Sequence, residues 1–437
     1  MLFVVGIVVF VLGLLASIAL HEVGHMVPAK RFGVRVSQYM VGFGPTLWSR
    51  TRGETEYGLK AVPLGGYVRL IGMYPTAEAV DAQPRAGRLA ELVQSAREAS
   101  AAEILPGEDH RAFYRLSAPK KLVVMLGGPV MNLVLAFVLL AIALSGIGVV
   151  GATTTVGALS ECVVADATTE CGPEDQVAPA TASGMALGDE IVAFDGHEVA
   201  GWAELTELIR EAGGRTVPVV VERDGTEVTL DVPLALVDRA VLDGAGQPVL
   251  DAAGEPVTRP TGFLGVTPTA ALQRQPLSEV PAVFATATWE TVKVVFTLPA
   301  KLVDLVRVTF GGGERDASSI IGIVGVGRIA GEAASVQVDG VGIAERVAAL
   351  LNLLASLNLA LFAFNLIPLV PLDGGHVVGA LWEGAKRQLA RVRGLAAPRP
   401  ADTARMAPLA YAVFVVLAGM GLLLVYADLV RPVSLSG

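Results

Sequence analysis

Four long apolar stretches constrain the fold of this chain more than any other feature. Each is long enough for a helix to cross the hydrocarbon core of a bilayer, which takes about 20 residues. Hydrophobic residues make up 53% of the chain and charged residues 17%, which is too apolar for an ordinary soluble domain. The sequence therefore predicts a mainly α-helical polytopic membrane protein. Its transmembrane segments are expected at residues 1–29, 122–150, 347–382 and 406–430.

The first apolar stretch resembles a signal peptide in length. It has no basic start, however, and no small-residue cleavage site follows it. We therefore expect it to be retained as a transmembrane helix.

The charges around the spans predict an orientation. Lys and Arg gather in residues 30–121 and after the third span, whereas the region between the second and third spans is acidic. Cytoplasmic flanks of membrane proteins are enriched in Lys and Arg. We therefore expect a multi-pass protein of the cell (plasma or inner) membrane, with both termini and residues 151–265 outside. Residues 78–103, rich in Ala, Glu and Arg, predict a solvated helix or a mobile loop within the cytoplasmic region.

Net charge and cysteine content exclude several classes of protein. A net charge of -9 without a compensating basic tract argues against a nucleic-acid partner and leaves the lipid bilayer as the expected one. Two cysteines, Cys162 and Cys171, are too few for a cysteine-built zinc cage or a disulfide-dense scaffold. If they lie outside, a disulfide between them is permitted. Two unpaired, buried thiols are the alternative.

The residues that carry chemistry follow the first apolar stretch, in the sequence HEVGH. Residues four apart share one face of a helix, so His21 and His25 can bind one zinc ion. Glu22 lies beside the same metal and can take a proton from water, whose pKa zinc lowers toward ~7. A chance match or a polar helix end is the alternative. Ionisable residues are costly at the end of a membrane span, which favours the metal site.

A catalytic zinc site needs a third protein ligand. Asp373 ends an apolar run that Pro368 and Pro371 interrupt, in the sequence NLIPLVPLDGGH. An aspartate at membrane depth needs a partner, and zinc is a suitable one. An ordinary Asp-Gly turn is the alternative. His376 is a rival ligand, and its role stays open.

Together these motifs resemble the bacterial site-2 proteases, which are intramembrane zinc metalloproteases with an extracytoplasmic PDZ domain. The resemblance covers nearly the whole chain, with the motifs in the family's order. It rests on HEVGH, on GGPVMN at residues 127–132, on NLIPLVPLDGG at residues 365–375 and on ETEYGLKAVPLGGYVRLIGM at residues 54–73.

The resemblance implies roles for particular residues. His21, His25 and Asp373 would bind Zn²⁺, and Glu22 would be the general base. Asn365 would contact substrate or stabilise developing charge. Further substrate-binding residues would be Gly65, Gly66 and Asn132, with helix packing as the alternative for Asn132.

The resemblance also implies smaller elements. Residues 54–73 would form a membrane-associated β-hairpin whose edge holds the substrate as an added strand. Residues 151–265 would form an inserted α+β PDZ-like domain that filters substrates by size or docks them. Within it, Asp224 and Gly225 predict a hairpin turn. Residues 281–310 mix apolar and charged side chains and predict an amphipathic helix along the membrane surface.

The implied function is cleavage of the transmembrane segments of single-span membrane proteins. Their outer parts would already have been shortened, as in regulated proteolysis of anti-sigma factors or of remnant signal peptides. A membrane scaffold with a degenerate metal site and a transporter with broken helices are the alternatives. The complete HEVGH motif together with Asp373 argues against both.

Overall fold

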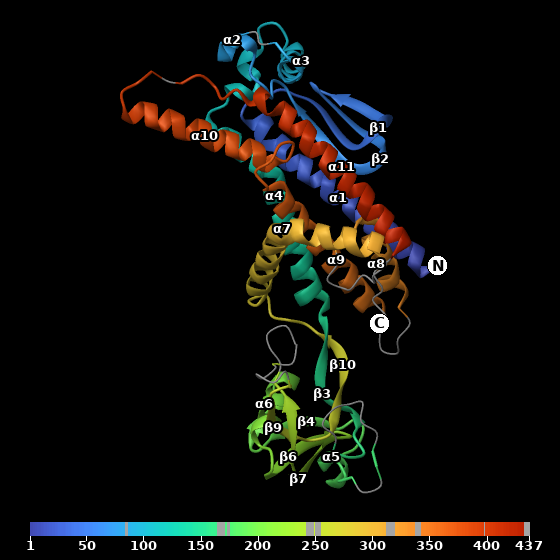
Figure 1. The fold of residues 1–437 in the computed structure, drawn as a ribbon. Coiled ribbons are helices and arrows are strands. Elements are labelled where there is room, and N and C mark those ends of the chain that lie inside the picture. Colours follow the sequence, from blue (N-terminus) through green and yellow to red (C-terminus); the bar gives the residue numbers. More distant parts are fainter. Residues whose placement is uncertain are drawn as a thin grey trace. The chain divides into compact units, whose positions relative to one another are not determined.

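The computed structural model describes residues 1–83, 86–163, 171–172, 175–241, 249, 255–311, 320–336, 342–396 and 398–431. The chain divides into two compact units. The first is mainly helical and combines Met1–Gly148 with Arg274–Gly437, and the second is Val149–Gln273. Figure 1 shows both units.

Among the described residues, four helices of the first unit are long and apolar enough to cross a membrane. They are α1 (Leu2–Arg31), α4 (Ala118–Ala141, continued by a π-helical turn to Ile147), α9 (Ile343–Asn365) and α11 (Ala407–Val430). The third helix is shorter than expected, because it ends before Pro368 and Pro371, which cannot continue it. The chain then passes through an irregular segment into a separate helix, α10 (Asp373–Val392).

Glycines set the close contacts of α1. A Cβ on Gly24 would lie 2.3 Å from the carbonyl oxygen of Gly127 in α4, so the two backbones touch at this crossing. A Cβ on Gly6 would lie 2.5 Å from Cβ of Ala334 in α8 (Ile323–Ser335). Small residues let helices approach in a membrane, where dispersion contacts drive their association. The α1–α4 crossing therefore lies directly beside the HEVGH motif.

Helix α7 (Val280–Gly311) covers the stretch in which an amphipathic helix was expected. Several of its large apolar side chains are exposed, among them Trp289 and Phe296. Its association with a membrane surface stays a prediction.

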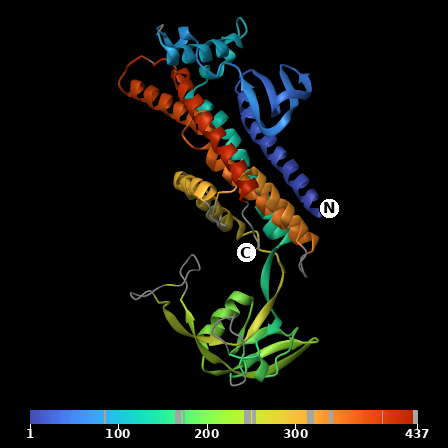
Figure 2. The ribbon, with the colours of Figure 1, turned by 45° about the vertical axis from the view of Figure 1, so that its right-hand side comes forward.

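Two long antiparallel strands, β1 (Val36–Arg52) and β2 (Thr55–Leu70), pack beside the carboxyl-terminal half of α1 (Figure 2). Both strands bend. Residues 38–41 of β1 therefore have residues 56–59 on one side and residues 66–69 on the other. The partner of β2 thus precedes it in the sequence, whereas the hairpin was expected within residues 54–73. In the described structure, residues 66–69 form an edge of this sheet.

Helix α3 (Arg88–Ala102) packs against other parts of the first unit. Its Arg97, only 5% exposed, donates to both carboxylate oxygens of Asp402 at 2.8 and 3.0 Å. The Ser100 hydroxyl accepts from the backbone N–H of Tyr74 and donates to its carbonyl oxygen. Of the two alternatives for residues 78–103, the structure therefore has the helix, over Arg88–Ala102, and its outer face is exposed.

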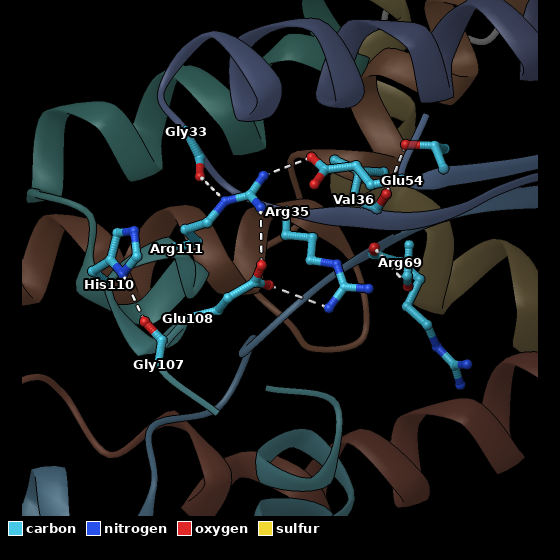
Figure 3. A network of polar contacts seen from close by, with 11 residues as sticks. Gly33, Arg35, Val36, Glu54, Arg69, Gly107, Glu108, His110 and Arg111 are labelled. Carbon is cyan, nitrogen blue, oxygen red and sulfur yellow. Dashed lines mark hydrogen bonds and ion pairs between the residues drawn. The ribbon is translucent and has the colours of Figure 1, made fainter. Parts of the chain in front are cut away.

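A polar network ties the segment after α3 to the sheet (Figure 3). Arg111 donates to Glu54, at the turn between β1 and β2, over 2.6 Å, and to the carbonyl oxygen of Gly33 over 3.4 Å. Glu108 accepts from both Arg111 and Arg35. The hydrogen bond from Arg111 holds the pKa of Glu54 below its ordinary value. The network fixes the sheet relative to the end of α1.

The second unit is a mixed α/β structure. Its larger sheet has the strand order β10-β3-β4-β6-β7, with β5 beside β4, and strands β8 and β9 form a separate pair. Helix α6 (Trp202–Glu211) buries Leu205 and Ile209 against the sheet core. The strands are β3 (Val149–Leu159), β4 (Glu190–Phe194), β5 (His197–Glu198), β6 (Thr216–Arg223), β7 (Thr226–Pro233), β8 (Ala235–Ala240), β9 (Thr258–Phe263) and β10 (Val266–Gln273).

Two local predictions can be compared with this unit. Asp224 and Gly225 have φ values of 51° and 76° and join β6 to β7, so the predicted hairpin turn is confirmed. Cys162 and Cys171 form a disulfide, so the alternative of two unpaired thiols is wrong.

Candidate metal centre

The HEVGH motif lies in the last turns of α1, before that helix ends at Lys30 and Arg31. His21 and His25 are one turn apart, and their Nε2 atoms are 3.2 Å from each other. The His25 side chain is buried, and its Nδ1 lies 2.8 Å from the carbonyl oxygen of Val124 in α4. A proton on Nδ1 satisfies that carbonyl and leaves Nε2 as a lone-pair donor.

The glycine pair of the GGPVMN motif makes room for these imidazoles. A Cβ on Gly128 would lie 2.2 Å from Nε2 of His25 and 2.7 Å from Nε2 of His21. Gly127 forms the α4 side of the backbone contact with Gly24. The two motifs, about a hundred residues apart in sequence, therefore form one structural feature.

Asp373 reaches the same place from the other end of the chain. It is the first residue of α10 and follows the proline-broken segment after α9. Gly374 and Gly375 pack against that segment, since their Cβ atoms would lie 2.3 Å from the carbonyl oxygen of Ile367 and 2.5 Å from the amide nitrogen of Val370. The Asp-Gly-Gly sequence thus allows a tight turn and also aims a carboxylate at the histidines.

Three potential ligand atoms form a nearly equilateral triangle. Oδ2 of Asp373 lies 3.4 Å from Nε2 of His21 and 3.3 Å from Nε2 of His25. Zinc bonds of about 2.0–2.1 Å in tetrahedral geometry separate neighbouring ligand atoms by about 3.3–3.4 Å. Without a cation or proton between them, three such lone pairs would repel each other. The donor set and its spacing therefore fit Zn²⁺.

The other histidines do not join this group. Within the described residues, only His21, His25 and Asp373 form a cluster of the kind that holds a metal ion. His376 is half-buried one turn after Asp373 and lines the same cavity. His110 and His197 are exposed and contact nearby backbone carbonyl oxygens.

A cavity of about 1250 Å³ opens over the cluster. Among the predicted site residues, Glu22, Gly65, Gly66 and Asn365 line it together with the three cluster residues. Asn132 does not line it. Its side chain is fully buried in α4, and neither amide atom has a hydrogen-bond partner within the described structure.

The edge of β2 forms one wall of this cavity. A Cβ on Gly66 would lie 3.2 Å from Cγ of Glu22 and 3.0 Å from a methyl group of Ile18, so a side chain here would crowd α1. Gly65 has a φ of 127°, a conformation that favours glycine. Gly65 and Gly66 therefore let β2 pass close to Glu22, the candidate catalytic residue.

Tyr39 connects β1 to α1 through a hydrogen bond. Its hydroxyl donates to the carbonyl oxygen of Ala19 over 2.7 Å. Burial, and then the nearby charge of Glu22, raise the pKa of Tyr39 to about 12. The phenol therefore stays protonated near neutral pH and keeps donating this hydrogen bond.

The opposite walls of the cavity were not predicted from the sequence. One face of α3 contributes Ala96, Ala99 and Ser100, Glu103 follows that helix, and α11 contributes residues such as Tyr411 and Phe414. Small residues at spacings of three and four along α3 were the available signal. They indicate a face that packs closely, but not what it packs against.

Comparison with known proteins supports the same interpretation. The family model described as Peptidase family M50 matches residues 9–398. The chain belongs to peptidase family M50. The zinc metalloprotease Rip1 of Mycobacterium tuberculosis is 36% identical over the full length of both chains. The corresponding protein of Mycolicibacterium smegmatis is 35% identical, also over both full lengths. Metalloprotease MmpA of Caulobacter vibrioides is 27% identical over 87% of this chain and 86% of its own.

Membership of this family confirms the predicted site-2 protease relationship. The chain is a zinc metalloprotease, and Zn²⁺ is its cofactor. The four long apolar helices among the described residues agree with a membrane location.

Proposed function

We propose that this M50 metalloprotease is an intramembrane endopeptidase that cuts the transmembrane segments of single-span membrane proteins. The observation that carries the proposal is the position of the ligand triangle. It combines the end of the apolar helix α1 with the break after α9, at the floor of a cavity. Ionisable groups in such surroundings are costly and are typical of function.

In this proposal His21, His25 and Asp373 hold the metal. Zinc bound there supplies Lewis acidity, which polarises a carbonyl group and favours deprotonation of water near neutral pH. The Val124 carbonyl orients the His25 ring for this task, since it lies 2.8 Å from Nδ1.

Glu22 is the proposed general base. It lines the cavity one residue after the ligand His21. Its carboxylate would take a proton from the attacking water and later give that proton to the leaving amine. General acid–base catalysis of this kind typically contributes about 10²–10⁴-fold to the rate.

The edge of β2 is the proposed substrate platform. A helical substrate has its backbone groups paired, so it must unwind before its peptide bond can be attacked. Strand addition at residues 66–69 would replace the lost hydrogen bonds, with Gly65 and Gly66 allowing close approach. The Asn365 amide, at the end of α9 and in the cavity lining, would satisfy another freed backbone group.

The second unit is proposed to select substrates from outside the membrane. We propose that it is a PDZ-like domain on the extracytoplasmic side, with both chain termini on that side. The Cys162–Cys171 disulfide supports this orientation, because disulfides persist in oxidising compartments. In this arrangement, substrates would be membrane proteins whose outer domain has already been removed.

Replacement of Glu22 tests the proposal. Glu22→Ala should keep zinc bound, because the three ligands remain, and should lower cleavage about 10²–10⁴-fold. Zinc is measured in the purified protein, and substrates are sought as membrane-protein stubs that accumulate in cells carrying the variant. Glu91→Ala, on the exposed face of α3, is the control. Loss of activity without accumulation of any membrane stub would exclude transmembrane segments as the substrates.

A further inference from the structure

Helix α10 carries an apolar surface that faces away from the rest of the unit. The buried residues of α10 are Gly374, Gly375, Ala380, Glu383 and Ala390. The opposite side holds five large apolar side chains that are between 46% and 75% exposed. At 100° per residue they share a sector of about 100° of the helix circumference. This outer stripe consists of Val378, Leu381, Trp382, Leu389 and Val392.

The outer stripe is continuous along a helix that extends beyond its neighbours. In both Figure 1 and Figure 2 the carboxyl-terminal part of α10 stands away from the other helices. Large exposed apolar surfaces on a protein indicate a binding partner or a membrane.

The depth of α10 follows from an ion pair. Lys121 is in the first turn of α4, at one end of a helix suited to cross the membrane. Its Nζ lies 2.7 Å from Oε2 of Glu383, and both side chains are buried. The middle of α10 therefore lies level with the end of that membrane span. Residues beyond Glu383 leave the bundle at the level of the bilayer surface.

Basic side chains border the outer stripe on one side. At 100° per residue, Lys386 and Arg393 fall next to each other along that border. Nζ of Lys386 lies 5.8 Å from the centre of the Trp382 ring. Tryptophan prefers the headgroup region, and Lys and Arg near it are attracted to anionic lipids.

We propose that the outer stripe of α10 lies in the headgroup region of the bilayer, where Lys386 and Arg393 bind the phosphates of anionic phospholipids. Charge complementarity selects this partner over a second copy of the chain. A second copy would bring another pair of basic residues to the same border, whereas anionic lipid supplies the opposite charge.

This contact also bears on the metal centre. Asp373 is the first residue of α10, ten residues before Glu383 and thus about 15 Å along the helix. An anchor at the bilayer surface fixes the depth at which this end of α10 enters the cavity.

Tryptophan fluorescence tests the position of the stripe. The chain has four tryptophans, so replacing Trp48, Trp202 and Trp289 by Phe leaves only Trp382. The full-length variant is placed in nanodiscs whose lipids are brominated close to the headgroup. We expect several-fold quenching of Trp382 relative to nanodiscs without bromine. A matched variant that keeps only Trp202, in the second unit, should be unaffected. Equal signals from the two variants, or protection of Trp382 by concentration-dependent dimers, would overturn the proposal.

Energy transfer from Trp382 to pyrene-labelled lipid tests the headgroup contact. We expect transfer to phosphatidylglycerol to exceed transfer to phosphatidylcholine. Lys386→Gln should reduce this preference by up to about fivefold, because one basic residue at the surface contributes on that order. Arg391→Gln removes an equal charge from the opposite side of α10 and should have no effect. Zinc content verifies that each variant is folded. No lipid preference in the parent protein, or equal loss in both variants, contradicts the proposal.

Discussion

Gly128 has no side chain, and the space this leaves is next to the imidazole nitrogens. Its Cβ would lie 2.2 Å from Nε2 of His25. Gly128→Ala should therefore weaken zinc binding at least tenfold, because the histidines must move from the positions that suit a tetrahedral ion. Competition with a chelator measures the affinity. Gly419→Ala, on an open face of α11, is the control and should bind zinc like the parent.

Asp373 and His376 can be distinguished by single substitutions. Asp373→Asn should weaken zinc binding and stop cleavage, since an amide is a poorer and uncharged ligand. His376→Ala should retain zinc, because this residue lies outside the cluster. Zinc content and cleavage in detergent are the measurements. Loss of metal only in His376→Ala would make the histidine the third ligand.

Among single residues, the sequence predicts best the ionisable side chains that are rare in apolar stretches. His21, His25 and Asp373 were predicted as ligands, and the structure brings them together. Tyr39 could not be predicted, because a tyrosine on a strand has many possible partners. Its contact with Ala19 depends on the packing of β1 against α1.

Among the elements, α10 is joined to α4 by a buried ion pair between Glu383 and Lys121. Glu383→Ala would leave Lys121 buried without its partner, at a cost of about 3–5 kcal/mol. We expect lower thermal stability and weaker zinc binding together. Asp304→Ala removes an exposed partner of Arg307 and should change stability by less than about 0.5 kcal/mol. Unchanged zinc affinity in Glu383→Ala would separate this ion pair from the metal centre.

A second ion pair connects β6 to the turn before β4. Asp189, 1% exposed, accepts two hydrogen bonds from Arg223 at 2.7 and 2.8 Å, and these hold its pKa below the ordinary value. The folded state thus favours the carboxylate. Its contribution to stability is complete above the unfolded pKa of about 3.9 and is lost as the pH falls toward the folded pKa.

Amide hydrogen exchange, corrected for the intrinsic rate, measures this dependence. Protection of β4 and β6 should fall below about pH 4 in the parent protein. Asp189→Asn should lower protection at neutral pH and flatten the dependence. Asp231→Asn, at an exposed position of β7, should leave the profile unchanged. A profile that Asp189→Asn does not alter would contradict this account.

Elements differed in how well sequence predicted them. Long apolar helices have a strong signal, and each expected stretch overlaps one of the four in the described residues. The pairing of β2 was harder to predict, because residues 54–73 contain both glycines and apolar residues and fit a hairpin within themselves. The actual partner, β1, was decided by tertiary contacts with α1.

For the whole molecule, the boundary of the second unit makes a deletion practical. Val149, the first residue of β3, pairs with Gln273, the last residue of β10. Removing residues 150–272 should therefore leave the helices and the zinc content unchanged, since the cluster lies in the first unit. Under the filter proposal, the deleted enzyme should cut substrates whose outer domain is intact. A protein that retains zinc but cannot cut even a shortened substrate would show that this unit is required for catalysis.

The existence of an inserted domain was predictable, but its limits were not. The expected range of residues 151–265 falls inside the observed unit, Val149–Gln273. The expected range ends before β10, because the sequence of β10 has few features typical of a strand. Pairing with β3 makes β10 part of the second unit. Contacts far apart in sequence therefore decided the boundary.

The pairing of β3 with β10 also has an evolutionary consequence. Adjacent strands lie about 4.8 Å apart, so the chain leaves the helical unit and returns to it through a very narrow passage. A domain joined in this way can be duplicated, exchanged or lost without lengthening any helix. Lineages could then diversify what the protease meets outside the membrane while the histidines and the aspartate stay under an unchanged constraint. Substrate choice and chemistry would be inherited as separable traits.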